Sequence, residues 1–383
     1  MRELLSALRG RLDDGTPFAV ATVVGVRGSA PRRPGAAMAV TADGRVTGSV
    51  SGGCVEGAVY EAASESLGTG AAQLHTYGIS DDDAFAVGLT CGGTLQILVR
   101  PYTDAQPRRA LSVLLEALDR AEPVALATVI GGAAPLGAQR VIGTGHATGT
   151  CGDPGLDHAV TEDARGLLAQ GMTGVQSYGA HGERRMADVS VFVQAFAPPP
   201  RMLVFGAIDH AAATARMGSF LGYRVTVCDA RPAFATPERF PFADEVVRAW
   251  PHEYLAGTEV DERTVVCVLT HDPKFDIPLL RTALRTRAGY IGVMGSRRTH
   301  EDRNARLREE GVSERELARL ASPIGLDLGA RTPEETAVSI AAEIVRARWG
   351  GSGRPLAELT GAIHRPGRDG ADPAFAQVAE AEA

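Results

Sequence analysis

Three consecutive prolines at positions 198–200 constrain the fold of this 383-residue chain more than any other feature. A run of prolines forms a stiff, extended connector that cannot continue a helix or a central strand. Apolar, strand-like runs flank it at 189–197 and 201–207. The chain is also too long for one ordinary hydrophobic core. We therefore expect an N-terminal domain over residues 1–197 and a second domain over residues 201–350, joined by the proline linker 198–200.

The N-terminal domain contains an internal repeat. Residues 19–25 (AVATVVG) resemble residues 125–131 (ALATVIG), and the pair Tyr77-Gly78 stands 101 positions before Tyr178-Gly179. Each copy has the pattern strand, strand, strand, helix, strand, strand. We predict two related α+β units, at about residues 15–103 and 121–197. Chance similarity is the alternative, because strands rich in Gly, Ala, Thr and Val look alike.

After the prolines, short apolar strands alternate with helical segments. The expected strands are 202–205, 224–228, 265–269 and 290–293, and the expected helices are 210–221, 277–286, 299–310 and 333–349. Such alternation is typical of a parallel, doubly wound sheet. We therefore predict an α/β protein whose second domain is Rossmann-like. Residues 360–383 are rich in Gly, Ala and Glu with weak periodicity, and we expect a disordered tail there.

Composition excludes several classes of function. The net charge of −7 argues against a general nucleic-acid surface, and no apolar run approaches the length of a membrane span. The N-terminal segment reads as an amphipathic helix and not as a signal peptide. We expect a cytoplasmic protein without a membrane or nucleic-acid partner. The five cysteines are widely spaced and form no C-x-x-C, which disfavours a disulfide framework and a structural zinc site.

A glycine turn between the expected strand ending near residue 50 and the helical segment 55–67 is the strongest candidate site. Its candidate ligand-binding residues are Ser51, Gly52, Gly53, Cys54 and Glu56. Two glycines permit close approach of a ligand, and a helix N-terminus attracts anions and favours the thiolate form of a cysteine. The alternative is a packed turn with an inert buried cysteine and a helix-capping glutamate. The second copy has residues 152–157 (GDPGLD) at this place and lacks the thiol.

A second Cys-Gly-Gly element precedes the expected strand 94–99. It contributes Cys91, Gly92 and Gly93 as candidate ligand-binding residues. Two thiols beside glycine turns could converge on one ligand. The alternative is that Cys91 fills a core.

In the second domain, candidate residues follow the expected strands, where open α/β sheets bind ligands. They are Gly206, Asp209, Asp229, His271, Gly295, Ser296 and Arg297. Asp229 stands where a dinucleotide-binding protein places its ribose-binding carboxylate. Ile208, however, replaces the second glycine of the G-x-G-x-x-G fingerprint, so NAD(P) is only weakly indicated. Asp209 at a helix start is more often a cap than a catalyst.

Taken together, these elements resemble the XdhC/CoxI family, the accessory proteins of xanthine dehydrogenase and related molybdenum hydroxylases. The motifs that carry the resemblance are 51–56 (SGGCVE), 88–93 (GLTCGG), 204–207 (VFGA), 224–231 (RVTVCDAR), 269–272 (LTHD), 290–298 (YIGVMGSRR) and 323–335 (PIGLDLGARTPEE). The resemblance covers about residues 10–350. Many relatives have Gly-Ala-Gly where this chain has Gly206-Ala207-Ile208.

This resemblance implies a chaperone that binds the molybdenum cofactor (molybdopterin), protects it while it acquires its sulfido ligand and inserts it into the apo-hydroxylase. The implied partners are a cysteine-desulfurase-type sulfur donor and a molybdenum hydroxylase of the xanthine dehydrogenase type. Cys54 is the candidate contact to molybdenum or its sulfur, because soft molybdenum accepts a thiolate. Such a carrier need not be an enzyme. An NAD(P)-dependent oxidoreductase and a sulfurtransferase centred on Cys54 remain alternatives, and apolar helices are compatible with a homodimer.

Overall fold

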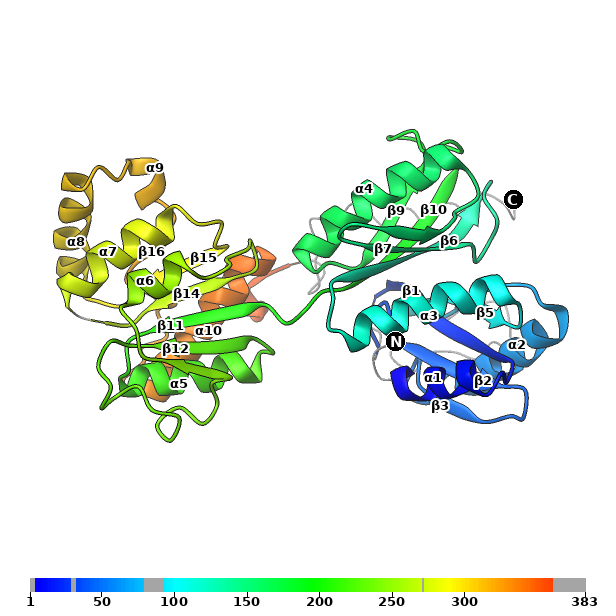
Figure 1. Ribbon diagram of the computed structural model, residues 1–383, viewed down its shortest axis with the longest axis horizontal. Helices are drawn as coiled ribbons and strands as arrows, with labels where there is room; N and C mark the ends of the chain where they lie inside the picture. The colour runs from blue at the N-terminus through cyan, green and yellow to red at the C-terminus, as the bar shows by residue number, and fades with distance from the viewer. Residues whose placement is uncertain (1–3, 29–31, 79–92, 271, 361–383) are drawn as a thin grey trace. The chain divides into compact units, whose positions relative to one another are not determined.

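The computed structural model describes residues 4–28, 32–78, 93–270 and 272–360. The chain divides into two compact units between Pro198 and Pro199 (Figure 1). All but the first residue of the tail predicted at 360–383 lies outside the described residues.

The first unit contains the same succession of elements twice. The first copy consists of α1 (Leu5–Asp13), β1 (Phe18–Arg27), β2 (Ala37–Thr41), β3 (Val46–Gly48), α2 (Glu56–Thr69), β4 (Gln73–Tyr77) and β5 (Thr94–Tyr102). The second copy consists of α3 (Ala105–Asp119), β6 (Val124–Gly132), β7 (Gln139–Gly143), β8 (Ala147–Gly149), α4 (Pro154–Gln170), β9 (Gly174–Tyr178) and β10 (Val189–Phe196).

The two sheets of this unit have the same topology. Their strand orders are β3-β2-β1-β5-β4 and β8-β7-β6-β10-β9, and the strand pairs are antiparallel. Each central pair also carries an irregularity at the same place, at Val24 on β1 and at Ile130 on β6. The internal duplication predicted from sequence is therefore confirmed.

Each sheet is covered by a helix on one face and by the other copy on the opposite face. Along β1, Ala19, Ala21 and Val23 belong to the core beneath α2, since alternate residues of a strand point to the same face. The bulged residues Val24 and Ile130 meet in a separate cluster between the copies. Helix α4 covers the second sheet in the corresponding way (Figure 1). Burial on both faces explains why β1 and β6 are apolar almost throughout.

The second unit is a doubly wound α/β domain. Its elements are β11 (Arg201–Phe205), α5 (Asp209–Phe220), β12 (Arg224–Cys228), β13 (Glu245–Val247), α6 (Pro251–Ala256), β14 (Val265–Val268), α7 (Pro273–Leu284), β15 (Tyr290–Val293), α8 (Arg297–Glu309), α9 (Glu314–Leu317), β16 (Leu320–Ala321), α10 (Pro333–Trp349) and a 3₁₀ turn (Leu356–Glu358). The parallel sheet has the order β13-β12-β11-β14-β15-β16.

Helices cover both faces of this parallel sheet. Helices α5 and α10 pack on one face, and α7 and α8 contribute to the core on the other. Thr332 and Glu335 form a capping box at the start of α10, and Gly350 ends that helix with a φ of 70°. The predicted Rossmann-like fold is confirmed.

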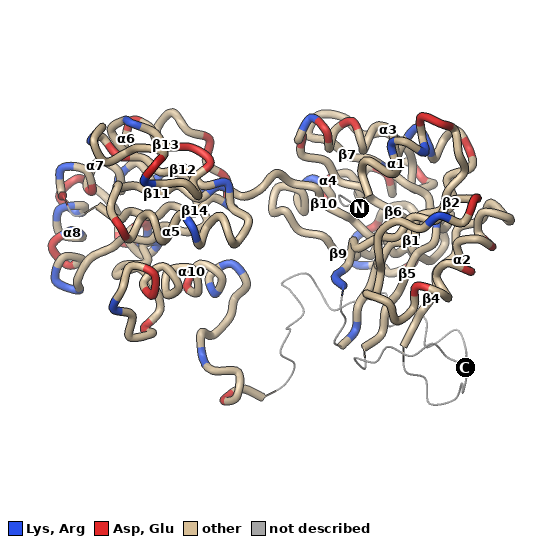
Figure 2. The backbone as a smooth tube through the Cα atoms, turned by 90° about the horizontal axis from the view of Figure 1, so that it is seen from below, with Lys and Arg blue, Asp and Glu red and all other residues tan. Residues whose placement is uncertain are grey.

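The surface carries both signs of charge on each unit, as the interspersed blue and red positions of Figure 2 show. Within the described part of the chain, no helix is both long and apolar enough to cross a membrane.

Candidate functional site

The turn before α2 is organised around the side chain of Glu56. Gly52 and Gly53 have φ angles of 78° and 123°, which a glycine adopts without steric cost. The turn thereby directs three consecutive backbone N–H groups inward, those of Ser51, Gly52 and Gly53, and all three donate to the Glu56 carboxylate at 2.8–2.9 Å. The hydroxyls of Ser49 and Ser51 donate to the same carboxylate.

These hydrogen bonds keep Glu56 ionised. Burial alone would raise the pKa of Glu56, but the Ser49 and Ser51 hydroxyls and the backbone donors lower it from 4.5 to about 2. The turn therefore already holds an anion, supplied by its own chain. The N–H groups of Ser51, Gly52 and Gly53 are therefore occupied by Glu56. The anion site expected at the N-terminus of the following helix stays a prediction.

The same turn leaves Cys54 accessible. Cys54 is partly exposed, whereas Cys151, Cys228 and Cys267 are buried and burial raises the pKa of each to about 12. A Cβ atom added at Gly52 or Gly53 would meet nothing within 4 Å. A ligand can thus approach the backbone of the turn, and the role of Cys54 as a reactive or ligand-binding thiol stays a prediction.

The corresponding turn in the second copy is held by different contacts. Asp157 replaces Glu56, and its shorter carboxylate accepts from the Cys151 N–H and pairs with Arg140 at 3.4 Å. Asp153 caps α4 instead. Gly155 stands where the first copy has Cys54, and a Cβ atom there would lie 2.3 Å from the carbonyl oxygen of His181. No side chain fits at that position.

The second Cys-Gly-Gly element lies only partly within the described residues. Cys91 and Gly92 lie outside the described residues, and Gly93 is buried immediately before β5. Convergence of Cys91 with Cys54 stays a prediction.

At the carboxyl edge of the parallel sheet, Asp229 is occupied by protein donors. Its carboxylate accepts from the Ala207 N–H at 2.7 Å and from the N–H, Nε and Nη2 of Arg231 at 2.8–2.9 Å. Burial opposes ionisation of Asp229, but the hydrogen bonds from Arg231 and Ala207 hold its pKa below the usual range. The expected role in binding ribose and a nicotinamide nucleotide is therefore not supported, because both carboxylate oxygens and the Ala207 donor are already used.

The neighbouring glycine and aspartate have separate environments. Gly206 has a φ of 109°, and a Cβ there would lie 3.0 Å from the Thr270 side chain, so the ends of β11 and β14 approach closely. Asp209 is the first residue of α5, and the N-cap position before it is Ile208, whose side chain makes no capping hydrogen bond. Its exposed side chain pairs with Arg239 at 3.6 Å.

Two further turns complete this edge. Ser296 caps α8 by accepting from the Thr299 N–H, and Gly295 precedes it with a φ of 153°. Arg297 is exposed at the start of α8, and His271 lies outside the described residues. Within the first unit the described site residues gather around Cys54, and within the second unit they lie along this sheet edge.

Sequence reasoning missed the group that fixes these turns. Asp276 and Arg303 form a buried ion pair at 3.1 Å, and Arg303 also donates to the carbonyl of Met294. The pair joins α7 to α8, 27 positions apart, and no spacing signal announces it. A group of three or more His, Cys, Asp or Glu side chains suited to hold a metal ion is absent from the described residues.

Comparison with known proteins places this geometry in one family. Residues 202–344 match the family described as the XdhC Rossmann domain, and residues 11–78 and 117–179 match the XdhC and CoxI family. The chain belongs to the XdhC and CoxI family. The second match includes the glycine turn with Cys54 and the part of each copy from its first strand to its fourth strand, β4 and β9, while β5 and β10 lie outside it. The strands of the parallel sheet from β11 to β16, apart from Arg201, fall within the first match.

Similarity to other members of the XdhC and CoxI family extends over most of the chain. It is 29% identical over 339 residues to a Bacillus subtilis protein named as a probable subunit of xanthine dehydrogenase, covering 88% of this chain and 95% of that one. It is 29% identical over 337 residues to the molybdenum cofactor insertion chaperone PaoD of Escherichia coli, and this similarity covers 88% of this chain and 85% of PaoD. A crystal structure described as a xanthine dehydrogenase from Bacillus halodurans shares the fold, with a TM-score of 0.62, 24% identity and coverage of 93% and 97%.

Proposed function

We propose that this protein is a carrier that binds the molybdenum cofactor and inserts it into a xanthine dehydrogenase-type molybdenum hydroxylase. Cys54 carries the proposal, as a partly exposed cysteine on a turn that the Glu56 carboxylate holds together. The similarity to PaoD over 88% of the chain supports the same function. The molybdenum cofactor is the cargo of such a protein and is not consumed.

Cys54 would contact the molybdenum or its sulfur ligand. A thiolate is a soft ligand that suits a metal already bound by dithiolene sulfur. The open surface over Gly52 and Gly53 lets a flat pterin approach the backbone beside the thiol. Because Glu56 takes the N–H groups of this turn, the terminal phosphate of the cofactor would be held elsewhere.

The partners follow from the chemistry of the cargo. The receiving partner is the cofactor-free form of a molybdenum hydroxylase, and the sulfido ligand requires a sulfur donor of the cysteine-desulfurase type. Protection during sulfuration means that Cys54 and its turn shield the molybdenum until transfer. A homodimer stays a prediction.

The decisive experiment is anaerobic. The full chain is mixed with released molybdenum cofactor and passed over a gel-filtration column, and molybdenum and pterin are measured in the protein peak. We expect near-stoichiometric retention by the wild type and weak retention by Cys54→Ala. The matched control is Cys151→Val, because the equivalent residue of the first copy is the fully buried Val50.

The outcomes separate the proposed carrier from the alternative sulfurtransferase. Equal retention by wild type and Cys54→Ala would remove Cys54 from the binding site. No retention by the wild type would overturn the carrier function. If instead the protein transfers sulfur from a persulfide on Cys54 at a catalytic rate and does not retain cofactor, the sulfurtransferase is correct.

A further inference from the structure

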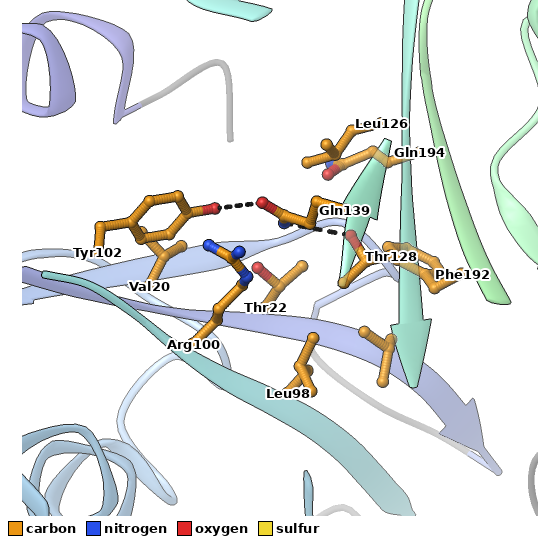
Figure 3. Close-up of a pocket in the computed structure, with 11 residues that line it drawn as sticks. Val20, Thr22, Leu98, Arg100, Tyr102, Leu126, Thr128, Gln139, Phe192 and Gln194 are labelled. Carbon is orange, nitrogen blue, oxygen red and sulfur yellow. Dashed lines mark hydrogen bonds between the residues drawn. The ribbon is translucent and has the colours of Figure 1, made fainter. Parts of the chain in front are cut away.

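The cavity between the two sheets of the first unit is too small for a ligand. Its volume is about 10 Å³, the room of one water molecule at most (Figure 3). Arg100 and Gln194 line it from equivalent positions of the repeat, opposite Val20 and Leu126 respectively. The cavity therefore belongs to the packing between the two copies.

An open groove of about 450 Å³ lies beside strand β9 in the second copy. It is lined by residues that include Gly166 of α4, Gln176 and Ser177 of β9, and Arg184 and Arg185 of the following segment. Successive side chains of a strand point to opposite faces, so a groove that both Gln176 and Ser177 line follows the edge of the sheet. Strand β9 is the outermost strand and pairs with β10, and within the described residues its other edge has no partner strand.

This edge is able to accept another strand. In an antiparallel pair, alternate residues direct their N–H and C=O groups away from the partner strand. Natural edge strands usually carry a charged residue or a proline that prevents further pairing, and β9, with the sequence GVQSY, has neither. An extended peptide in the groove can therefore form main-chain hydrogen bonds with β9.

Gly166 keeps the groove open. A glycine inside a helix is destabilising relative to alanine, yet a Cβ atom at Gly166 would meet nothing within 4 Å, so packing does not require glycine there. Helices α2 and α4 end at the equivalent residues Gly70 and Gly171, and by the same count Glu65 holds the position of Gly166 in the first copy. In the second copy, this position thus leaves the space beside β9 free of a side chain.

The charges around the groove leave one cation without a counterion. Asp163 pairs with Arg184 at 2.8 Å, and Glu162 pairs with Arg165 at 3.0 Å. Arg185 is exposed and forms no ion pair with any of the described residues. A carboxylate on the occupant of the groove would complement this guanidinium.

We propose that the groove binds an extended, acidic segment of the hydroxylase that receives the cofactor. The segment adds to the second sheet as a sixth strand along β9, places a side chain in the space beside Gly166 and pairs a carboxylate with Arg185. The choice of partner rests on the proposed function, whereas the free edge, the open space and the charge are properties of the groove itself.

The test measures the Kd between the full chain and a cofactor-free molybdenum hydroxylase of the same organism by calorimetry. Gly166→Gln fills the groove, and we expect the Kd to rise at least about tenfold. Arg185→Gly removes the charge at a backbone φ of 69°, which glycine adopts readily, and should raise the Kd about fivefold. Ala169→Gln is the matched control, because Ala169 is exposed on α4 and does not line the groove, and its Kd should stay within about twofold.

Hydrogen exchange of the wild-type protein gives a direct readout. The outward N–H groups of β9 have no strand partner in the free protein, and we expect them to exchange at least about tenfold more slowly in the complex with the hydroxylase. Because this measurement uses only the wild type, it decides the question even if a variant does not fold.

The outcomes separate this inference from the proposed function. If the hydroxylase binds but neither the variants nor the exchange of β9 respond, the groove is not the docking site and the carrier function stands. If the hydroxylase does not bind, the inference and the insertion step are both overturned, while the retention assay still reports on cofactor binding. If sedimentation shows a wild-type dimer that Gly166→Gln converts to a monomer, the occupant is a second copy and the inference is wrong.

Discussion

Arg100 and Gln194 occupy equivalent positions in the two copies of the repeat, and each donates to a glycine carbonyl of the other copy. Their acceptors, Gly137 and Gly35, are themselves equivalent, because each donates its backbone N–H to the carbonyl of an equivalent valine, Val129 and Val23 respectively. The two copies therefore meet as the protomers of a symmetric dimer would, with one contact surface used twice.

Two equivalent glycines should be equally intolerant of alanine. Gly48 and Gly149 have φ angles of 85° and 92°, and a Cβ at either would lie 2.3–2.4 Å from a backbone carbonyl oxygen. We expect Gly48→Ala and Gly149→Ala each to lower the free energy of unfolding by about 3 kcal/mol or more. Gly52→Ala, with a φ of 78° but open space around it, should cost only about 1–2 kcal/mol. Urea unfolding of the three variants measures the difference, and equal costs would contradict it.

Replacing Glu56 should destabilise the first unit in a pH-dependent way. Glu56→Gln leaves the donors of the turn poorly satisfied, and we expect a loss of about 2 kcal/mol at pH 7. Since the folded pKa of about 2 lies below the ordinary 4.5, the contribution is present above pH 4.5 and is lost as the pH falls toward 2. Urea unfolding at pH 7, 4 and 3 should show that the difference in free energy of unfolding between wild type and variant becomes smaller as the pH falls.

Glu65 provides the control for this experiment. It lies exposed on the same helix, and Glu65→Gln should change the free energy of unfolding by less than about 0.5 kcal/mol at every pH. If the loss of free energy of unfolding in Glu56→Gln stays constant down to pH 3, the pKa of Glu56 is not lowered by the hydrogen bonds of the turn in the way described.

Alkylation should distinguish Cys54 from the buried cysteines. A thiol with a pKa of about 12, as at Cys151, Cys228 and Cys267, is ionised to only about one part in 10,000 at pH 8. The experiment uses a Cys91→Ser variant, so that Cys54, Cys151, Cys228 and Cys267 are the cysteines that remain. We expect iodoacetamide to modify Cys54 while the three buried cysteines remain unmodified. Peptide mass spectrometry at increasing reaction times gives the order in which the cysteines are alkylated. Modification of Cys151 as early as Cys54 would contradict the burial of the second copy's turn.

The second unit should not bind a nicotinamide nucleotide. Asp229 and the Ala207 N–H bind each other, and Arg231 takes the remaining acceptor positions. We expect no saturable change in NADH fluorescence at nucleotide concentrations up to about 1 mM. Saturable binding that Asp229→Asn abolishes would show that the carboxylate exchanges Arg231 for ribose.

The sequence predicts the fold well because its signals are local. The alternation of strands and helices after the prolines and the similar runs at 19–25 and 125–131 depend on periodicity alone, and both predictions are confirmed. The site is harder to predict, because it depends on which donor meets which acceptor. The sequence shows that Glu56 lies in the first turn of a helix. It does not show that the Glu56 carboxylate accepts hydrogen bonds from the N–H groups of the preceding glycine turn. The pairing of Asp276 with Arg303 and the contact of Arg100 with Gly137 arise only when distant segments pack.

The repeat also fixes how many accessible thiol turns one molecule can present. A dimer of two identical half-length chains would carry a pair of such turns related by symmetry. In this single chain Gly155 stands in one half at the position that Cys54 holds in the other, and both halves keep the equivalent contacts of Arg100 and Gln194. Within the part of the chain described, each polypeptide thus offers a single turn of the Cys54 type.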